Sequence, residues 1–297
     1  MKTRRLGRLA ALAAALSLAA APALAKPRDA DPALWVVRDA DTTIYLFGTV
    51  HLLPGGLEWF DEAVADAFKA SDELKMELLP VDDPAQLAPL IMQLAVDPNG
   101  RTMSQRLSPE DHAAYVKALK SLGLPAEQLE PLEPWFIGVQ ASILMSVQAG
   151  LDPKAGAEEV LTKAARKARK TITAFETPKE QFTILDSIPE AEQMAGIHDI
   201  IHRREEGIAV MSQMIDHWAR GDADGAGRLM NAEMKDTPET IRLLLTERNI
   251  RWAAELKSRM DRPGVVFVAV GAGHLAGENS VQDLLEKEGL KVERIAY

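Results

Sequence analysis

The sequence predicts an α/β fold with a central, mostly parallel sheet and a large helical insertion at about residues 84–240. Three observations predict it. Apolar, β-rich runs lie near both ends of the mature chain, and helical spacing dominates the middle. The run at 264–270 is continuous, apolar and β-branched, as expected of a central parallel strand. Because N- and C-terminal segments would share one sheet, we expect residues 26–297 to be a single domain.

The first 25 residues have the pattern of a secretory signal peptide. Basic residues at 2, 4, 5 and 8 precede an Ala/Leu-rich run, and Ala23-Leu24-Ala25 fits a cleavage site. We expect cleavage near Ala25–Lys26 and a periplasmic or secreted protein without stable membrane insertion. The alternative, an uncleaved anchor helix, fits less well because the apolar run is short and Ala-rich.

Composition narrows the classes of function. The chain has 297 residues, 47% hydrophobic and 26% charged, with a formal net charge of −10, which is typical of a soluble globular protein. The absence of cysteine excludes disulfides, cysteine-ligated zinc, iron–sulfur clusters and thiol catalysis. No basic patch stands out, so we expect no nucleic-acid partner.

Short strands and one helix are predicted at the start of the mature chain. Residues 35–38 and 42–47 are β-prone and flank Asp39-Ala40-Asp41, which predicts a hairpin. Helical spacing follows at about 57–69, and residues 74–78 indicate another strand.

Helices dominate the middle of the chain. Residues 84–96 have helical spacing, and Ser108-Pro109-Glu110-Asp111 is a typical helix start. The apolar run at 135–147 predicts a buried helix too short to span a membrane. A basic amphipathic helix at 157–170, a strand at 171–175 and a helical run at 179–220 with a break near Pro189 follow.

The last part of the chain alternates helix and strand. Thr237-Pro238-Glu239 opens a helix that runs to about residue 260, before the buried strand at 264–270. A helix at 280–288 ends at Gly289, and the alternation at 291–295 predicts a final strand.

Two segments share one form: an apolar strand, a Gly, two residues and a His. They are Gly48-Thr49-Val50-His51 and Gly271-Ala272-Gly273-His274. Glycine at a strand end permits a tight turn and close approach of a ligand, so Gly48, Gly271 and Gly273 are candidate binding positions. Ligands of open α/β sheets bind beyond the carboxyl ends of the strands, where two imidazoles suit a metal ion or proton transfer. The alternative is two unrelated loop histidines.

Two carboxylates have the same placement. Glu77 lies near the end of the strand at 74–78, and Glu176 directly follows the strand at 171–175. In one parallel sheet, these groups would converge with His51 and His274. Either His51, His274 and Glu77 hold a divalent metal (Mn, Co or Zn) with an open position for water, or one Glu is a general base beside a positioned His. The alternative for each Glu is a solvated charge.

Three further sets of residues allow either a functional or a structural interpretation. Arg248-Asn249 lies near Leu245 and Trp252 on an inward helix face, where Arg248 would hold a substrate carboxylate or stabilise an oxyanion; the alternative is a surface ion pair. His198 and His202 have the spacing of a zinc-peptidase helix. However, Asp199 replaces the Glu of that motif and two arginines follow, so we expect a solvated or interfacial face. Met211 and Met214 are expected to fill the core.

The order of these residues resembles the TraB/GumN family, within a wider group that includes Tiki-type proteases, erythromycin esterases and ChaN-like proteins. The resemblance covers nearly the whole mature chain, at Leu34-Trp35, 44–54, Glu77, 149–152, 175–181, 247–252 and 270–277. One departure is Gly156-Ala157-Glu158, where the family usually has Gly-Val-Asp, so the acid is kept but lengthened.

The resemblance implies one site lined by His51, Glu77, Glu176, Arg248, Asn249 and His274. It also implies an enzyme of the cell envelope in which water attacks the carbonyl of a peptide or small ester. Tiki-type relatives imply a metal at the histidines, whereas esterase relatives imply a His base; Glu77 or Glu176 would be ligand or base. ChaN-like relatives imply the alternative, a non-catalytic envelope protein that binds haem or metal.

Overall fold

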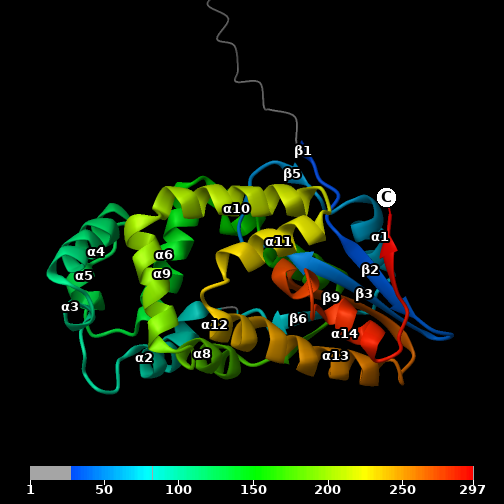
Figure 1. Cartoon of the computed structure of the whole chain (residues 1–297). Helices are drawn as coiled ribbons and strands as arrows, with labels where there is room; N and C mark the ends of the chain where they lie inside the picture. Colours follow the sequence, from blue (N-terminus) through cyan, green and yellow to red (C-terminus); the bar gives the residue numbers. More distant parts are fainter. Residues whose placement is uncertain (1–27, 82, 297) are drawn as a thin grey trace, which may run out of the picture.

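The computed structural model describes residues 28–81 and 83–296, so the predicted signal peptide at 1–25 lies outside the described residues. Figure 1 shows a sheet with helices on both faces, beside a region built from helices alone. None of the helices in the described ranges is long and apolar enough to cross a membrane.

The main sheet has six strands in the order β10-β2-β3-β9-β6-β8. They are β2 (Leu34–Arg38), β3 (Thr42–Thr49), β6 (Glu73–Leu78), β8 (Thr171–Glu176), β9 (Gly264–Gly271) and β10 (Val292–Ile295). Two small sheets pair β1 (Arg28–Asp29) with β5 (Leu57–Glu58) and β4 (Leu53–Pro54) with β7 (Leu151–Asp152).

The main sheet is mixed, so the expectation of a mostly parallel sheet is confirmed only for its four parallel strands. β3, β9, β6 and β8 pair in parallel, whereas β2 is antiparallel to both β3 and β10. The reason is the tight turn at 39–41, where the Asp39 carboxylate accepts the N–H groups of Asp41 and Thr42 at 3.1 and 2.8 Å. A turn this short joins only antiparallel strands.

The four parallel strands bring their carboxyl ends to one edge of the sheet. β3 and β9 are aligned so that Gly48 is opposite Val270 and Thr49 is opposite Gly271. The two Gly-x-x-His segments are therefore neighbours. A side chain at Gly48 would place its Cβ 3.0 Å from the Ala272 Cα atom, which explains why glycine stands there.

Helices bury both faces of the sheet. One face packs Phe47, Trp59 and Phe267 against Trp218, and the other packs Val266 and Val268 against Trp252. Successive residues of β9 therefore point to opposite faces, as expected of a strand buried on both sides. The covering helices are α1 (Glu62–Ala70), α7 (Ala157–Ala168) and α10 (Arg204–Ala219) on the first face, with α13 (Glu247–Arg259) and α14 (Val281–Lys287) on the second.

A separate hydrophobic cluster holds the helical region together (Figure 1). Tyr115, Leu119, Ile137 and Ile197 are fully or almost fully buried in it. Its helices are α3 (Met103–Arg106), α4 (Pro109–Ser121), α5 (Ala126–Leu129), α6 (Pro134–Gln148) and α9 (Glu190–His202). The remaining helices are α2 (Ala88–Ala95), α8 (Pro178–Asp186), α11 (Ala223–Glu233) and α12 (Pro238–Ile241).

Two predicted segments are divided in the structure. β8 joins the main sheet from within residues 84–240, so the helices of that range form two stretches with a strand between them. The helix predicted at 237–260 consists of α12, one π-helical turn (Arg242–Thr246) and α13. Such turns widen a helix locally and are frequent at functional sites; this one directly precedes Glu247 and Arg248.

Candidate functional site

Arg248 is the centre of a buried charge network at the carboxyl edge of the sheet. Its Nε donates to the Glu176 carboxylate at 2.9 Å, and its Nη2 donates to Glu176 at 2.9 Å and to Glu77 at 2.7 Å. Its Nη1 donates to the Leu244 carbonyl at 3.0 Å and to His274 Nε2 at 3.1 Å. All five guanidinium N–H groups therefore have protein partners.

This arrangement gives Arg248 a different role from the one expected. A guanidinium without a free donor cannot stabilise an oxyanion or hold a substrate carboxylate unless one of these contacts breaks. Arg248 instead joins strands β6 and β8 to α13 through their carboxylates. Arg251, which the sequence analysis did not single out, adds a second contact to Glu176 at 2.9 Å and so balances the two negative charges.

His274 is held in one tautomer by its two neighbours. Arg248 can only donate, so His274 Nε2 accepts. The Nδ1–H then donates to Asn249 Oδ1 at 2.6 Å, and Asn249 donates through Nδ2 to the Asn279 carbonyl at 2.9 Å. The His274 ring also lies 4.3 Å from the Trp252 ring, centroid to centroid. Asn249 is thus a positioning residue for a buried imidazole.

Burial and charge set the ionisation of the network. Burial lowers the pKa of His274 to about 4, against the attraction of Glu77, so its imidazole is neutral at pH 7. Burial opposes ionisation of Glu77 as well. Nevertheless His274, Arg248 and the N–H of Gly271, which donates to Glu77 at 2.6 Å, together hold the pKa of Glu77 below its usual value.

His51 lies at the same edge but in a different environment. Its Nδ1 is 2.7 Å from Glu158 Oε1, and its side chain is 71% exposed. Hydrogen bonding and charge attraction from Glu158 raise the pKa of His51 to about 9. Glu158 stands where the family usually has Asp, so its role was not predicted from the sequence. In the structure, its longer side chain reaches the His51 ring.

Close backbone packing holds His51 against α7. The Ala157 N–H donates to the Val50 carbonyl at 3.0 Å. A Cβ atom at Gly156 would lie only 2.0 Å from the His51 carbonyl oxygen, so only glycine fits. Glu158, two residues later in the first turn of α7, is thereby delivered to the imidazole.

The expected metal set of His51, His274 and Glu77 is not assembled in this arrangement. Arg248 takes the His274 Nε2 lone pair and one Glu77 oxygen, and Gly271 N–H takes the other. A cation there would have to displace a guanidinium. Across residues 28–81 and 83–296, no three His, Asp or Glu side chains are grouped closely enough for a metal ion. The described residues therefore do not fit the metal.

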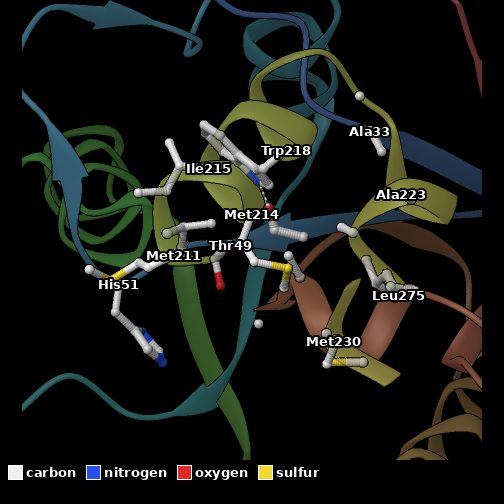
Figure 2. Close-up of a pocket in the computed structure, with 18 of the residues that line it drawn as sticks. Ala33, Thr49, His51, Met211, Met214, Ile215, Trp218, Ala223, Met230 and Leu275 are labelled. Carbon is white, nitrogen blue, oxygen red and sulfur yellow. Dashed lines mark hydrogen bonds between the residues drawn. The ribbon is translucent and has the colours of Figure 1, made fainter. Parts of the chain in front are cut away.

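An apolar cavity of about 280 Å³ lies beside His51. Both Gly-x-x-His turns line it, with Gly48, Thr49 and Gly273 among the contacts. In Figure 2, Met211, Met214, Ile215 and Trp218 come from one helix, α10, and Thr49 and His51 come from the end of β3. Trp218 Nε1 also donates to the Gly48 carbonyl at 2.7 Å, which ties α10 to the turn.

Sequence reasoning missed this cavity. Met211 packs against the hydrophobic core, as expected, and it also lines the cavity together with Met214. The signal that could have found them is the spacing of 211, 214, 215 and 218, which is one face of a helix. His198 and His202, by contrast, lie apart from the site: their rings are 4.4 Å apart, and His202 pairs with Asp111 at 2.8 Å.

Comparison with known proteins agrees with this account of the chain. The family model described as "TraB/PrgY/gumN family" matches residues 33–294. The uncharacterized protein YbaP of Escherichia coli is 20% identical over 241 residues, 81% of this chain and 87% of YbaP. The metalloprotease TIKI2 of Danio rerio is 24% identical over 302 residues, 84% of this chain and 58% of TIKI2. No solved structure matches significantly. The chain therefore belongs to the TraB/PrgY/gumN family.

Proposed function

We propose that this protein is a hydrolase in which His51, held by Glu158, activates water for attack on a peptide or small-ester carbonyl. The observation that carries the proposal is the His51–Glu158 pair, with Nδ1 2.7 Å from the carboxylate, on a side chain that is 71% exposed and lines a cavity. A carboxylate that orients one ring nitrogen and leaves the other open is the arrangement of a general base. The similarity to TIKI2, which is named a metalloprotease, supports hydrolytic chemistry.

In the proposed reaction, the two ring nitrogens of His51 have different roles: Nε2 transfers the proton and Nδ1 is held by Glu158. The neutral form of His51, whose share grows as the pH rises towards the raised pKa of about 9, takes a proton from water at Nε2 while its Nδ1–H remains on Glu158. The hydroxide oxygen bonds to the carbonyl carbon, and the tetrahedral intermediate then expels the amine or alcohol as Nε2 returns the proton to it. Arg248, Glu77, Glu176, Asn249 and His274 form the rigid edge of the sheet beside this centre. No step is routed through a metal, because His274 and Glu77, two of the three expected ligands, are already engaged.

Metal dependence and location stay as proposals with their own tests. A thermal-shift titration of the mature protein with Mn²⁺, Co²⁺ and Zn²⁺, beside His51→Ala, would reveal a metal that binds through His51. N-terminal sequencing of protein recovered from the cell envelope would test the predicted cleavage after Ala25. A cytoplasmic protein that keeps residues 1–25 would contradict the proposed location.

The hydrolase is tested with p-nitrophenyl esters and a fluorogenic peptide library, each assayed with chelator and with each metal. We expect His51→Ala to lose about 100- to 10,000-fold in kcat/KM, the usual contribution of a general base. The matched control is His202→Ala, because His202 forms a similar histidine–carboxylate pair, with Asp111, away from the cavity. Unchanged activity in a folded His51→Ala variant would overturn the proposal. Stoichiometric uptake of haem or metal without any product would favour the ligand-binding alternative.

A further inference from the structure

We propose that the cavity beside His51 is the subsite for an apolar group of the substrate, next to the bond that is hydrolysed. This inference rests on the proposed hydrolase. The apolar group is either a side chain of a peptide or the acyl chain of an ester, since both present the same surface to the cavity walls. We refer to this cavity, lined by Met211, Met214, Ile215, Trp218 and Met230, as the methionine cavity.

The walls of the methionine cavity are almost entirely apolar. Met211, Met214, Ile215 and Trp218 present one face of α10, and Met230 comes from α11 opposite. Methionine is flexible and polarizable, so such walls adapt to apolar groups of different shape. No charged side chain other than His51 is among the lining residues.

The size of the cavity suits one substrate group. Ligand sites for whole drug-sized molecules span about 300–1,000 Å³, whereas a cavity of about 150 Å³ already holds benzene. At about 280 Å³, the methionine cavity has room for a side chain such as Leu, Met or Phe, or for a short acyl chain. It is too small to enclose a long peptide.

A buried hydroxyl in the wall supports a ligand in this position. Thr49 is 3% exposed, and its Oγ1 is buried with no hydrogen-bond partner in the described part of the chain. Buried polar atoms are rarely left unpaired, because they lose their bonds to water. A substrate carbonyl or amide that follows the apolar group into the cavity would pair with this hydroxyl.

The position of the cavity links it to the proposed chemistry. His51 lines the methionine cavity, and its side chain is 71% exposed. Thr49 and His51 are two residues apart at the end of β3. An apolar group seated beside Trp218 and Met214 would therefore have its adjoining carbonyl near the end of β3, where His51 lies.

The test compares substrates that differ only in the apolar group. One arm uses p-nitrophenyl acetate and hexanoate; the other uses paired peptides with Gly or Leu beside the scissile bond. Each buried methylene favours binding by about a factor of four, so hexanoate should exceed acetate by up to about 200-fold in kcat/KM. The arm with the larger preference identifies the source of the apolar group.

Variants of Met214 connect that preference to the cavity. Met214→Trp should fill the cavity and abolish the preference, whereas Met214→Ala should enlarge it and shift the preference towards longer groups. The control is Met92→Trp, because Met92 is 45% exposed on α2 and does not line the cavity. Met92→Trp should keep the wild-type preference. If Met214→Trp does not fold, Met214→Ala still tests the inference.

A binding measurement separates this inference from the proposed function. Calorimetry with hexanoate and with N-acetyl-leucinamide is run on His51→Ala, which the hydrolase proposal makes inactive, with and without Met214→Trp. Hydrolysis without any preference for apolar groups would overturn the inference and leave the hydrolase standing. If the wild-type protein turns over no substrate, but either probe binds and Met214→Trp abolishes that binding, the cavity is supported as a site for apolar groups and the hydrolase is overturned. If the protein shows no preference for apolar groups and binds neither probe, the inference is overturned.

Discussion

Replacing Arg248 by methionine should destabilise the protein strongly at neutral pH. Arg248 is the shared cation of two carboxylates, and the side chains of Glu176 and Glu77 are only 3% and 14% exposed. Methionine keeps much of the volume but leaves these two carboxylates without their common partner. Arg251 still contacts Glu176, but its side chain is 52% exposed and it has no recorded contact with Glu77.

The size of the effect follows from burial. Removing one member of a buried ion pair costs about 3–5 kcal/mol, because an uncompensated charge remains away from water. For a chain of this size that corresponds to a fall in melting temperature of about 6 °C or more. Arg248 also fixes the His274 tautomer, so the loss should reach the edge of the sheet and not only α13.

The pH dependence gives the sign of the effect. The folded-state pKa of Glu77 lies below its usual value of 4.5, so its contribution to stability is present above that pH and is lost as the pH falls through the folded-state pKa. The difference between wild type and Arg248→Met should therefore be largest near pH 7 and shrink on acidification below about pH 4.5.

Thermal unfolding from about pH 3 to pH 8 measures both effects. Arg242→Met is the matched control, because Arg242 also bridges two carboxylates, Glu239 and Glu247, but on the surface. Exposed pairs contribute little, so this variant should melt close to the wild type. An Arg248→Met variant that melts as Arg242→Met does would refute the reasoning.

Three further predictions concern the surroundings of His51. Glu158→Gln should lower the pKa of His51 from about 9 towards 6.5, as measured by NMR titration of the ring; an unchanged midpoint would show that Glu158 does not pair with it. Since that pKa is higher in the folded state, the pair stabilises the fold below pH 6.5, and this contribution is lost as the pH rises through about 9. Gly156→Ala should lower the melting temperature markedly, because its Cβ would lie 2.0 Å from the His51 carbonyl oxygen, whereas an equally stable variant would contradict this packing. Trp218→Phe should cost about 1–3 kcal/mol in chemical denaturation, since the buried Gly48 carbonyl loses its donor; a change near zero would show that water replaces the indole.

Much of the sheet was predictable because its strands carry strong local signals. The β-prone run at 42–47 and the apolar run at 264–270 predict β3 and β9, and a glycine near the end of each marks where the strand stops. The direction of β2 was set by the short turn at Asp39 and could be foreseen from the hairpin alone. Once four strands are parallel, their carboxyl ends necessarily meet, so His51 and His274 approach the same edge.

The contacts within the site could not be predicted in the same way. Spacing places Arg248 on an inward face, but only the fold shows that every one of its N–H groups is engaged. Glu158 lies two residues after Gly156, where only glycine allows the close approach to the His51 carbonyl. That contact joins two segments more than 100 residues apart in the chain, so local sequence does not reveal it. Helical spacing likewise cannot distinguish a face that fills the core from one that lines a cavity, as Met211 and Met214 illustrate.

Chemical rescue of His51→Ala tests the central claim most directly. The alanine variant leaves a space beside Glu158 that free imidazole can enter, so added imidazole should restore hydrolysis in proportion to its concentration, up to saturation. The restored rate should follow the neutral form of imidazole as the pH is varied, because that form accepts the proton of water. The account would be contradicted if His51→Ala hydrolyses substrate as fast as the wild type. It would also be contradicted if His51→Ala is inactive and stays inactive at every imidazole concentration.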